Sequence, residues 1–320
     1  MQLAINIGLS VIGFAMLIKC ADFFVDGAAS FARNLYIPTT VIGLTIVAFG
    51  TSAPELAISF SSHLSGNTDI LFGNVIGSGI ANIFVILGLA VLIVPFKISN
   101  AVILKEIPIL LLVTIGFSVL FLDNIFSSAT NNALTRADGI ILILLFTIFI
   151  YYLITILKNK GERIENEKKP KYKVFKSIIM ILFGLGGIIL GSKLVVDNLA
   201  FLAEYIGISQ KIISVTIIAI GTSLPELVTT IVAAKKGENN MAIGNIIGSN
   251  IFNICIVFGL PVVILGEVAT RAFNYIDIIF MLAAVLLLWL FTTTGRQLKR
   301  YEGAILVAMY CMYGGYIFLQ

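Results

Sequence analysis

The sequence predicts an all-α polytopic membrane protein with ten transmembrane helices, arranged as two inverted-topology repeats of five helices each. Three observations predict this fold class. Long apolar runs follow one another along nearly all of the 320 residues, basic residues gather on alternate connections, and a polar motif inside an apolar run occurs twice at a fixed spacing. Together they exclude a soluble globular domain.

The composition fits a chain that lies mainly in lipid. Hydrophobic residues make up 59% of the chain and charged residues 12%, with a mean hydropathy of +1.05, whereas a soluble domain carries about 25% charged residues. Apolar runs of about 20 residues can cross the hydrocarbon core of a bilayer as helices. The ten predicted spans cover residues 3–25, 39–62, 69–95, 103–122, 137–157, 174–199, 211–234, 241–265, 275–293 and 302–319.

The placement of positive charge predicts the orientation. The longest polar stretch, KNKGERIENEKKPKYKVFK at residues 158–176, belongs in the cytoplasm if basic connections stay inside. The same side then holds Arg33, Lys97, Lys105, Lys235, Lys236, Arg296, Lys299 and Arg300, and the opposite side only Arg136, Lys211 and Arg271. Five spans on each side of the loop place both termini outside the cytoplasmic membrane. A lipid-binding or regulatory role for the loop is the alternative reading.

This placement also accounts for the net charge of +4. We therefore expect the lipid bilayer and inorganic cations as partners, and no nucleic acid. The sequence leaves the oligomeric state open, a monomer included.

Two pairs of segments define an internal repeat. VIGLTIVAFGTSAPELAISF at residues 41–60 matches IISVTIIAIGTSLPELVTTI at residues 212–231, and GNVIGSGIANI at residues 73–83 matches GNIIGSNIFNI at residues 244–254. Both pairs share one offset of 171 residues. The predicted division is a first five-helix repeat at residues 1–157, a cytoplasmic linker at 158–173 and a second five-helix repeat at 174–320.

An odd number of spans per repeat makes the two repeats enter the membrane in opposite senses. Such inverted repeats are typical of secondary transporters, whose substrate sites lie near the bilayer midplane on interrupted helices. The repeated motifs contain such interruptions. Pro54 and Pro225 lack an N–H and clash with the carbonyls four residues back, those of Gly50 and Gly221. Backbone freed in this way is tolerated in a bilayer only inside the protein or beside a watery cavity.

The side chains around the prolines supply oxygen atoms and neither sulfur nor imidazole. Helical spacing groups them in matching sets: Thr51, Ser52 and Glu55 with Thr222, Ser223 and Glu226, and Asn74, Ser78 and Asn82 with Asn245, Ser249 and Asn253. A carboxylate at membrane depth is costly and marks a functional site. Two carboxylates among neutral oxygens suit a hard cation, and Ca²⁺ prefers six to eight oxygens in adaptable geometry.

Some repeated residues have two readings. Asn74 and Asn245 could serve the ion site or helix packing, and the glycines Gly73, Gly77, Gly244 and Gly248 permit close helix approach. Asp26 and Asp197 lie near predicted helix ends, where capping, an interface role or gating would each explain them.

The paired motifs GTSAPE with GNVIGSGIAN, and GTSLPE with GNIIGSNIFN, resemble the two alpha repeats of the calcium:cation antiporter superfamily. The chain looks most like its prokaryotic sodium/calcium exchanger branch. The resemblance covers essentially the whole chain, and it implies an antiporter with a central cluster of cation sites. The first and sixth helices would slide across the core to alternate access.

The resemblance also implies roles for individual residues. Glu55 and Glu226 would coordinate calcium, helped by the backbone oxygens of Thr51 and Thr222, with Asn82 between the glutamates. Flanking sodium sites would use the hydroxyls of Ser52, Ser78, Thr222, Ser223 and Ser249 and the backbone oxygens of Ala48 and Ala219.

Asn253 departs from several sodium-coupled members, which carry an aspartate at this position. The site then holds only two carboxylates, which can balance one calcium ion, two sodium ions or two protons. We expect exchange of Ca²⁺ for Na⁺, with H⁺-coupled or K⁺-dependent Ca²⁺ antiport as the alternatives. No cofactor is expected besides the transported ions.

Two other classes of function fit less well. A cation channel usually forms its pore between subunits or from ion-lining rings, which an inverted repeat with paired interrupted helices does not suggest. An intramembrane hydrolase would need a Ser-His pair or a histidine-bound metal, and His63 is the only histidine. We therefore do not expect an enzyme.

Overall fold

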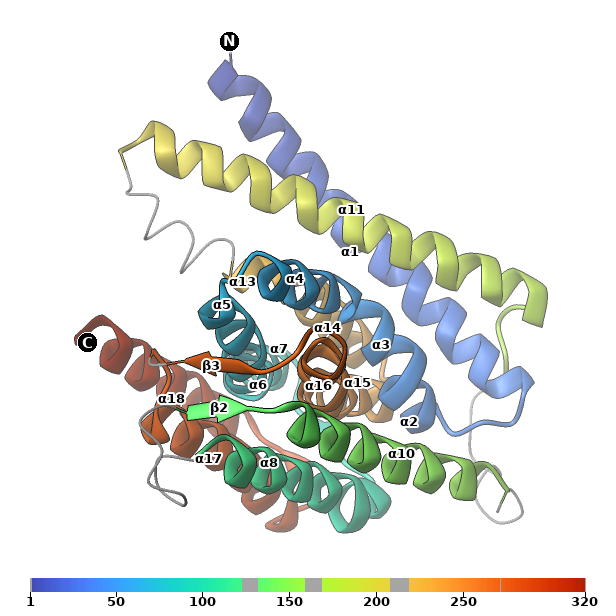
Figure 1. Cartoon of the computed structure of the whole chain (residues 1–320). Helices are drawn as coiled ribbons and strands as arrows, with labels where there is room; N and C mark the ends of the chain where they lie inside the picture. The colour runs from blue at the N-terminus through green and yellow to red at the C-terminus, as the bar shows by residue number, and fades with distance from the viewer. Residues whose placement is uncertain (1, 123–131, 159–168, 208–218, 271, 320) are drawn as a thin grey trace.

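The structure, a computed structural model, describes residues 2–122, 132–158, 169–207, 219–270 and 272–319 (Figure 1). Most of these residues are helical. Several spans consist of consecutive segments that alternate between α-helical and π-helical (η) hydrogen bonding. The first half contains α1 (Gln2–Asn34), α2 (Thr39–Ile42), η1 (Gly43–Val47), α3 (Ala48–Thr51), α4 (Ala53–Leu64), α5 (Thr68–Phe72), η2 (Gly73–Gly77), α6 (Ser78–Ala81), η3 (Asn82–Leu87), α7 (Gly88–Ile93), η4 (Val102–Glu106), α8 (Ile107–Phe121) and α10 (Arg136–Lys158).

The second half has fewer described interruptions. It contains α11 (Val174–Tyr205), α13 (Ala219–Thr222), α14 (Leu224–Lys235), α15 (Asn239–Phe252), η6 (Asn253–Phe258), α16 (Gly259–Leu265), α17 (Tyr275–Thr293) and α18 (Arg300–Leu319).

The described helices confirm a membrane protein. Seven helical stretches are long and apolar enough to cross a bilayer, and a bent pair, Thr39–Thr51 with Ala53–Leu64, makes eight. The other two predicted spans are not counted among them. Of the span predicted at 211–234, residues 211–218 lie outside the described residues, and the span predicted at 302–319 forms α18.

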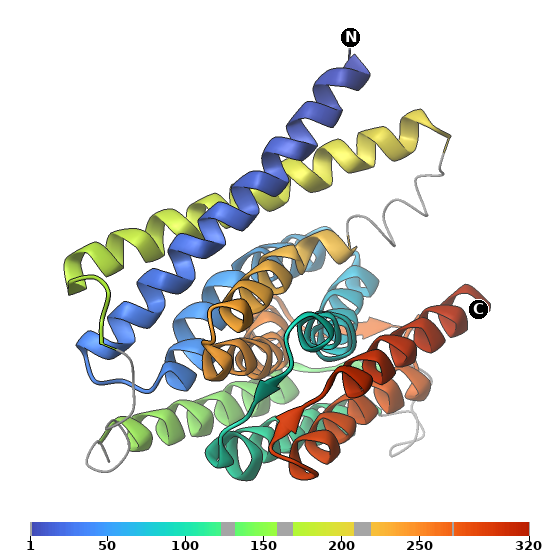
Figure 2. The ribbon, with the colours of Figure 1, turned by 180° about the vertical axis from the view of Figure 1, so that it is seen from behind.

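Helices α1 and α11 lie side by side and cross at an angle on one side of the molecule (Figures 1 and 2). Both are longer than the sequence predicted. Helix α1 has 33 residues and continues to Asn34 instead of ending near residue 25. At 1.5 Å per residue it is about 50 Å long, more than the roughly 30 Å of a bilayer's hydrocarbon core. Hydropathy ended the prediction at Asp26, but ion pairs in the folded chain allow the helix to continue.

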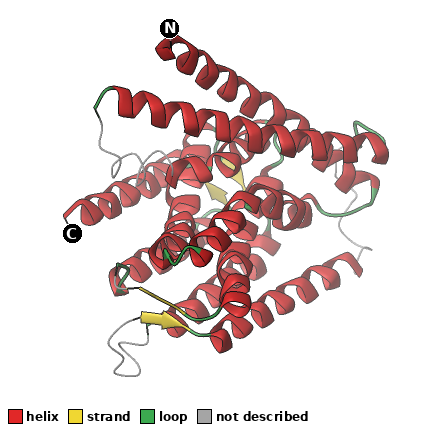
Figure 3. Ribbon diagram, turned by 45° about the horizontal axis from the view of Figure 1, so that its top comes forward, coloured by secondary structure: helices red, strands yellow, loops and turns green. Residues whose placement is uncertain are grey.

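Two small antiparallel sheets, which the sequence did not predict, accompany the helices (Figure 3). Strand β1 (Phe96–Lys97) pairs with β4 (Gln297–Leu298), and β2 (Asn132–Leu134) pairs with β3 (Val268–Thr270). Each strand lies in a connection between helices. The hydropathy pattern of the sequence does not predict such short strand pairs there. Each sheet joins one connection of the first half to one of the second.

The centre of the molecule is formed by the interrupted helices and those beside them. In the most apolar window of the stretch Asn239–Leu265, 83% of the residues are buried, against 17% in α10. The second half thus supplies a helix that is enclosed on all sides, while α10 presents most of its surface outward.

Candidate cation-binding site

Two breaks with the same backbone geometry position the glutamates. The helix is interrupted at Ser52 (φ −87°, ψ 7°) and at Ser223 (φ −92°, ψ 6°). Pro54 and Pro225 then lie at the start of α4 and α14, where a proline's missing N–H costs nothing. Glu55 and Glu226 therefore lie in the first turn of a new helix, where the helix dipole favours a carboxylate.

Both glutamates are enclosed, with 1% of Glu55 and none of Glu226 exposed. The Ser52 hydroxyl donates to Oε1 of Glu226 across 2.9 Å and so links the two halves. Within the described part of the chain, no donor reaches Oε2 of Glu226 or either carboxylate oxygen of Glu55. Buried acceptors without donors are rare and costly, so these oxygens fit a site that a cation completes.

Asn82 and Asn253 add two more oxygens of this kind. They begin η3 and η6, which are equivalent π-helical segments of the two halves. The Asn253 amide donates to the Ser78 hydroxyl across 3.1 Å, and the Asn82 amide donates to Oδ1 of Asn250 at 3.5 Å. The Oδ1 atoms of Asn82 and Asn253 are buried and accept no hydrogen bond from the described residues. Helix α4 packs against η6 and α14 against η3, so each glutamate helix contacts the asparagine segment of the other half.

The hydroxyl of Thr51 lies near acceptors of both halves. It donates to the carbonyls of Val47 at 3.0 Å and Ala48 at 3.3 Å, and it lies 3.3 Å from Oδ1 of Asn245. The Ser249 hydroxyl points to the Ala48 carbonyl at 3.5 Å. The structure thus brings Thr51, Ala48 and Ser249 together beside the first break.

The second break lies between α13 and α14. Ala219 begins α13, and its side chain lies outside the described residues; Ser223 is buried at the break, and Thr222 is half-buried just before it. The carbonyl of Gly221, which Pro225 was predicted to free, accepts a hydrogen bond from the Ser192 hydroxyl on α11 at 2.9 Å. A side chain on another helix therefore satisfies this carbonyl.

Asn74 and Asn245, for which two readings were open, hold neighbouring helices together. The Asn74 amide donates to the Glu55 carbonyl at 2.9 Å and to the Ser59 hydroxyl at 3.0 Å. The Asn245 amide donates to the Thr230 hydroxyl at 2.9 Å. Both asparagines fix the helix that carries a glutamate, and so position the site.

Sequence reasoning missed Ser59, Thr230, Asn250 and Ser192. Ser59 and Thr230 could have been found, because they share the offset of 171 residues that relates the motifs. Asn250 and Ser192 have no polar counterparts in the first half, because Gly79 and Ala21 occupy the matching positions. A search for repeated polar residues therefore does not find Asn250 or Ser192.

Glycines bring α15 against the first interrupted helix. A Cβ at Gly248 would lie 2.6 Å from the Leu44 carbonyl oxygen, and one at Gly244 would lie 2.7 Å from that of Thr40. These two glycines therefore permit backbone contact, as predicted. Gly73 instead faces the Phe273 ring, and no described atom lies within 4 Å of a Cβ at Gly77.

The oxygen atoms available to a cation at this site carry few charges, and most of them are neutral. Among the described residues, no three His, Cys, Asp or Glu side chains gather as a metal site. Two carboxylates surrounded by hydroxyl, amide and carbonyl oxygens suit an alkali or alkaline-earth ion better than a transition metal.

The chain is similar to several known membrane proteins. The chain is 35% identical to the inner membrane protein YrbG of Escherichia coli, over 97% of this chain and 94% of that protein. It is 30% identical to the sodium/calcium exchanger MaX1 of Methanosarcina acetivorans, with 97% of each chain covered. A solved structure of the sodium-calcium exchanger NCX_Mj, soaked with zero Na⁺ and Ca²⁺, superposes with a TM-score of 0.84 at 30% identity, covering 98% of this chain and 99% of that one.

The family described as sodium/calcium exchanger protein matches residues 5–155 and 176–319, which is nearly the whole chain. The two matched stretches flank the linker that the sequence predicted. The chain belongs to the sodium/calcium exchanger family, in the prokaryotic branch of the calcium:cation antiporters.

Proposed function

We propose that this protein exchanges Ca²⁺ for Na⁺ by alternating access. The observation that carries the proposal is the pair of enclosed glutamates, Glu55 and Glu226, whose oxygens largely lack donors within the described chain. Membership of an exchanger family supports transport of these cations. The proposed ligands are Glu55, Glu226, Thr51, Thr222, Ser52, Ser223, Ser78, Ser249, Asn82, Asn253, Ala48 and Ala219.

Competition for the same oxygens would couple the two ions. Calcium or two monovalent cations can each neutralise the two carboxylates, whereas the empty site carries two uncompensated charges. Moving bare charges through a low-dielectric interior is costly. Only the loaded site would then cross between the two access states, and no chemical step is needed.

The arrangement of the two halves supports an inverted repeat. The breaks at Ser52 and Ser223 match, η3 and η6 match, and each small sheet pairs a strand from one half with a strand from the other. We assign residues 1–157 and 174–320 to the two five-helix repeats, with 158–173 as a cytoplasmic linker and both termini outside. In this arrangement α1 and α11 are the helices that slide across the core.

Proton-coupled exchange is the second candidate, and Asn253 favours it. Several sodium-coupled relatives would have a third carboxylate here, whereas the amide of Asn253 donates to Ser78 and adds no charge. Two protons on Glu55 and Glu226 would neutralise the site as well as two sodium ions do.

The deciding experiment is calcium uptake into proteoliposomes of the purified full chain. One set carries sodium inside and none outside at equal pH, and the other carries a pH gradient without sodium. We expect uptake with the outward sodium gradient alone. Uptake with the pH gradient alone would assign the coupling to protons, and no uptake with either gradient would contradict calcium antiport.

A further inference from the structure

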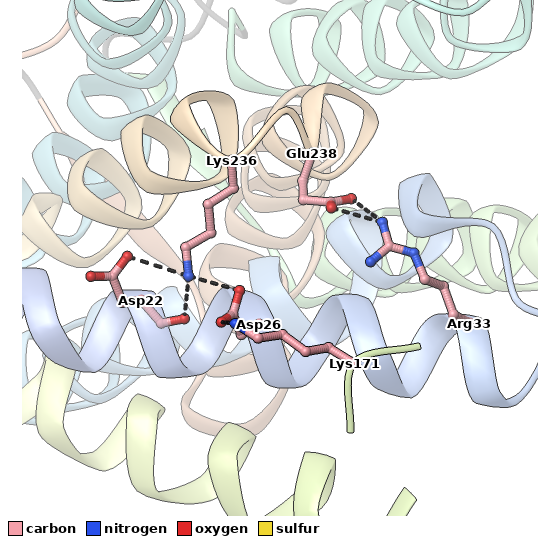
Figure 4. A network of polar contacts seen from close by, with 6 residues as sticks. All are labelled: Asp22, Asp26, Arg33, Lys171, Lys236 and Glu238. Atoms are coloured by element: carbon pink, nitrogen blue, oxygen red, sulfur yellow. Dashed lines mark hydrogen bonds and ion pairs between the residues drawn. The ribbon is translucent and has the colours of Figure 1, made fainter. Parts of the chain in front are cut away.

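An ion-pair network fastens α1 to the second half of the molecule (Figure 4). We call it the latch; it consists of Asp22, Asp26, Arg33, Lys171, Lys236 and Glu238. Lys236 lies 2.8 Å from Asp26 and 3.3 Å from Asp22, and Arg33 lies 2.7 Å from Glu238. Lys171 lies 3.0 Å from Asp26.

Two simple features of the chain create the latch. Asp22, Asp26 and Arg33 follow one another at helical spacing, so they share one face of α1. Opposite them is the turn between α14 and α15, where Gly237 has a φ of 73° and Lys236 and Glu238 stand on either side. The left-handed glycine turns the chain so that both charges meet the same helix.

The contacts of the latch differ in strength. Arg33 and Glu238 have side chains only 11% and 9% exposed, and one guanidinium nitrogen reaches both carboxylate oxygens, at 2.7 and 2.9 Å. Lys171 is 65% exposed, which makes its pair with Asp26 weak. The Asn34 amide also donates to the Tyr172 carbonyl at 2.6 Å, so the chain just before α11 is tied to the end of α1.

Among the described residues, the matching positions of the repeat do not form this ion-pair network. The equivalent turn is conserved in shape, because Gly66 has a φ of 75°, but Ser65 and Asn67 replace Lys236 and Glu238. On α11 the counterparts of the three α1 charges are Lys193, Asp197 and Glu204, all of which are exposed. Asp26 and Asp197, for which the sequence left interface and gating roles open, therefore lie in different surroundings.

We propose that the latch closes the linker face of the transporter and makes its two access states unequal in free energy. An inverted repeat with identical ends would favour neither state. Here the charges of the latch lie at only one end of α1, and they stabilise the state in which α1 rests on the turn between α14 and α15. The inference deepens the proposed function, since it rests on α1 being a helix that moves.

The test measures access without requiring transport. Ala29 lies on the same face of α1 as Asp26 and Arg33 and is 3% exposed. In a chain whose three cysteines, Cys20, Cys255 and Cys311, are replaced by alanine, Ala29→Cys supplies a reporter thiol. Membrane vesicles of both orientations receive a membrane-impermeant maleimide, and the labelling rate is measured on each face.

Lys236→Ser, which installs the residue found at position 65, is expected to raise labelling from the linker face about tenfold, equivalent to about 1.4 kcal/mol. The matched control is Lys235→Ser, because Lys235 is the adjacent lysine and is exposed; it should leave the rate unchanged. Asp26→Asn should act as Lys236→Ser does, in case the first variant fails to fold. The exchanged pair Arg33→Glu with Glu238→Arg should label at the parent rate, whereas Arg33→Glu alone should label faster.

Any of three results would contradict the proposed role of the latch. Lys236→Ser and Asp26→Asn could both label at the parent rate, or Lys235→Ser could raise the labelling rate as much as Lys236→Ser does. The third such result is an exchanged pair, Arg33→Glu with Glu238→Arg, that does not restore the parent rate. Calcium uptake is recorded on the same samples. A parent protein that labels as expected but moves no calcium would contradict the proposed antiport and leave the latch intact.

Discussion

At the first helix break, Ser52 donates a hydrogen bond to Glu226 of the other half. At the second break, Ser223 has nearly the same backbone angles, yet no hydrogen bond from it to Glu55 is described. Instead Gly221, two residues earlier, accepts from Ser192 on α11, whose counterpart on α1 is Ala21. The two halves thus share the backbone geometry of the break and the position of the glutamate, while single residue differences make the surroundings of the two breaks unequal.

The glutamates themselves are the strongest test of that comparison. We expect Glu55→Gln and Glu226→Gln each to lower calcium uptake by at least about 100-fold, because each removes half of the negative charge that a divalent ion requires. Uptake into proteoliposomes is the measurement, with Glu267→Gln as the control because Glu267 is exposed. Full uptake in either variant would show that the two positions are not equivalent ligands.

The close approach of α15 to the first interrupted helix gives the next largest effect. In Gly248→Ala the new methyl would lie 2.6 Å from the Leu44 carbonyl and 2.8 Å from the Ala48 Cβ. Such overpacking costs about 1–3 kcal/mol, so we expect a lower thermal unfolding midpoint in detergent and slower uptake. Gly186→Ala is the matched control, since no atom lies within 4 Å of its Cβ position among the described residues. Equal midpoints for the two variants would refute the tight crossing.

The smallest expected effect is a difference in calcium affinity between variants of Ser52 and Ser223. Ser52→Ala removes a hydrogen bond to a charged group, and such bonds contribute about 1.5–3 kcal/mol. We expect the apparent affinity for calcium to fall by roughly tenfold, and that of Ser223→Ala to fall less. Calcium titrations of uptake in the two variants compare them directly. Equal losses would mean that the two breaks are functionally symmetric.

The central parts of this molecule could be predicted from sequence because they repeat. Membrane crossing follows from apolar runs, and the glutamates follow from a motif that occurs twice at one offset. The placement of each proline at the start of a helix follows from its missing N–H. The ligand assignment itself stays a prediction, although the buried oxygens of Glu55 are consistent with it.

The missed features are those that depend on the other half of the chain. Helix α1 passes its predicted end because Asp26 and Arg33 find partners about 200 residues away. Strand β1 forms because β4 lies beside it, and no local sequence pattern at Phe96 and Lys97 predicts the pairing. Ser192 was overlooked because its counterpart in the first half is Ala21. A search for repeated residues finds the glutamates, but it cannot find a residue that only one half contains.

The two small sheets tie connections of the first half to connections of the second half. Ladder hydrogen bonds join the connection after α7 to the one before α18, and the connection after α8 to the one after α16. A motion that parted the two halves at these places would break both ladders at once. Helices α1 and α11 enter neither sheet. In the proposed antiport, the interrupted helices joined by these ladders would move as one body, and α1 and α11 would shift against it.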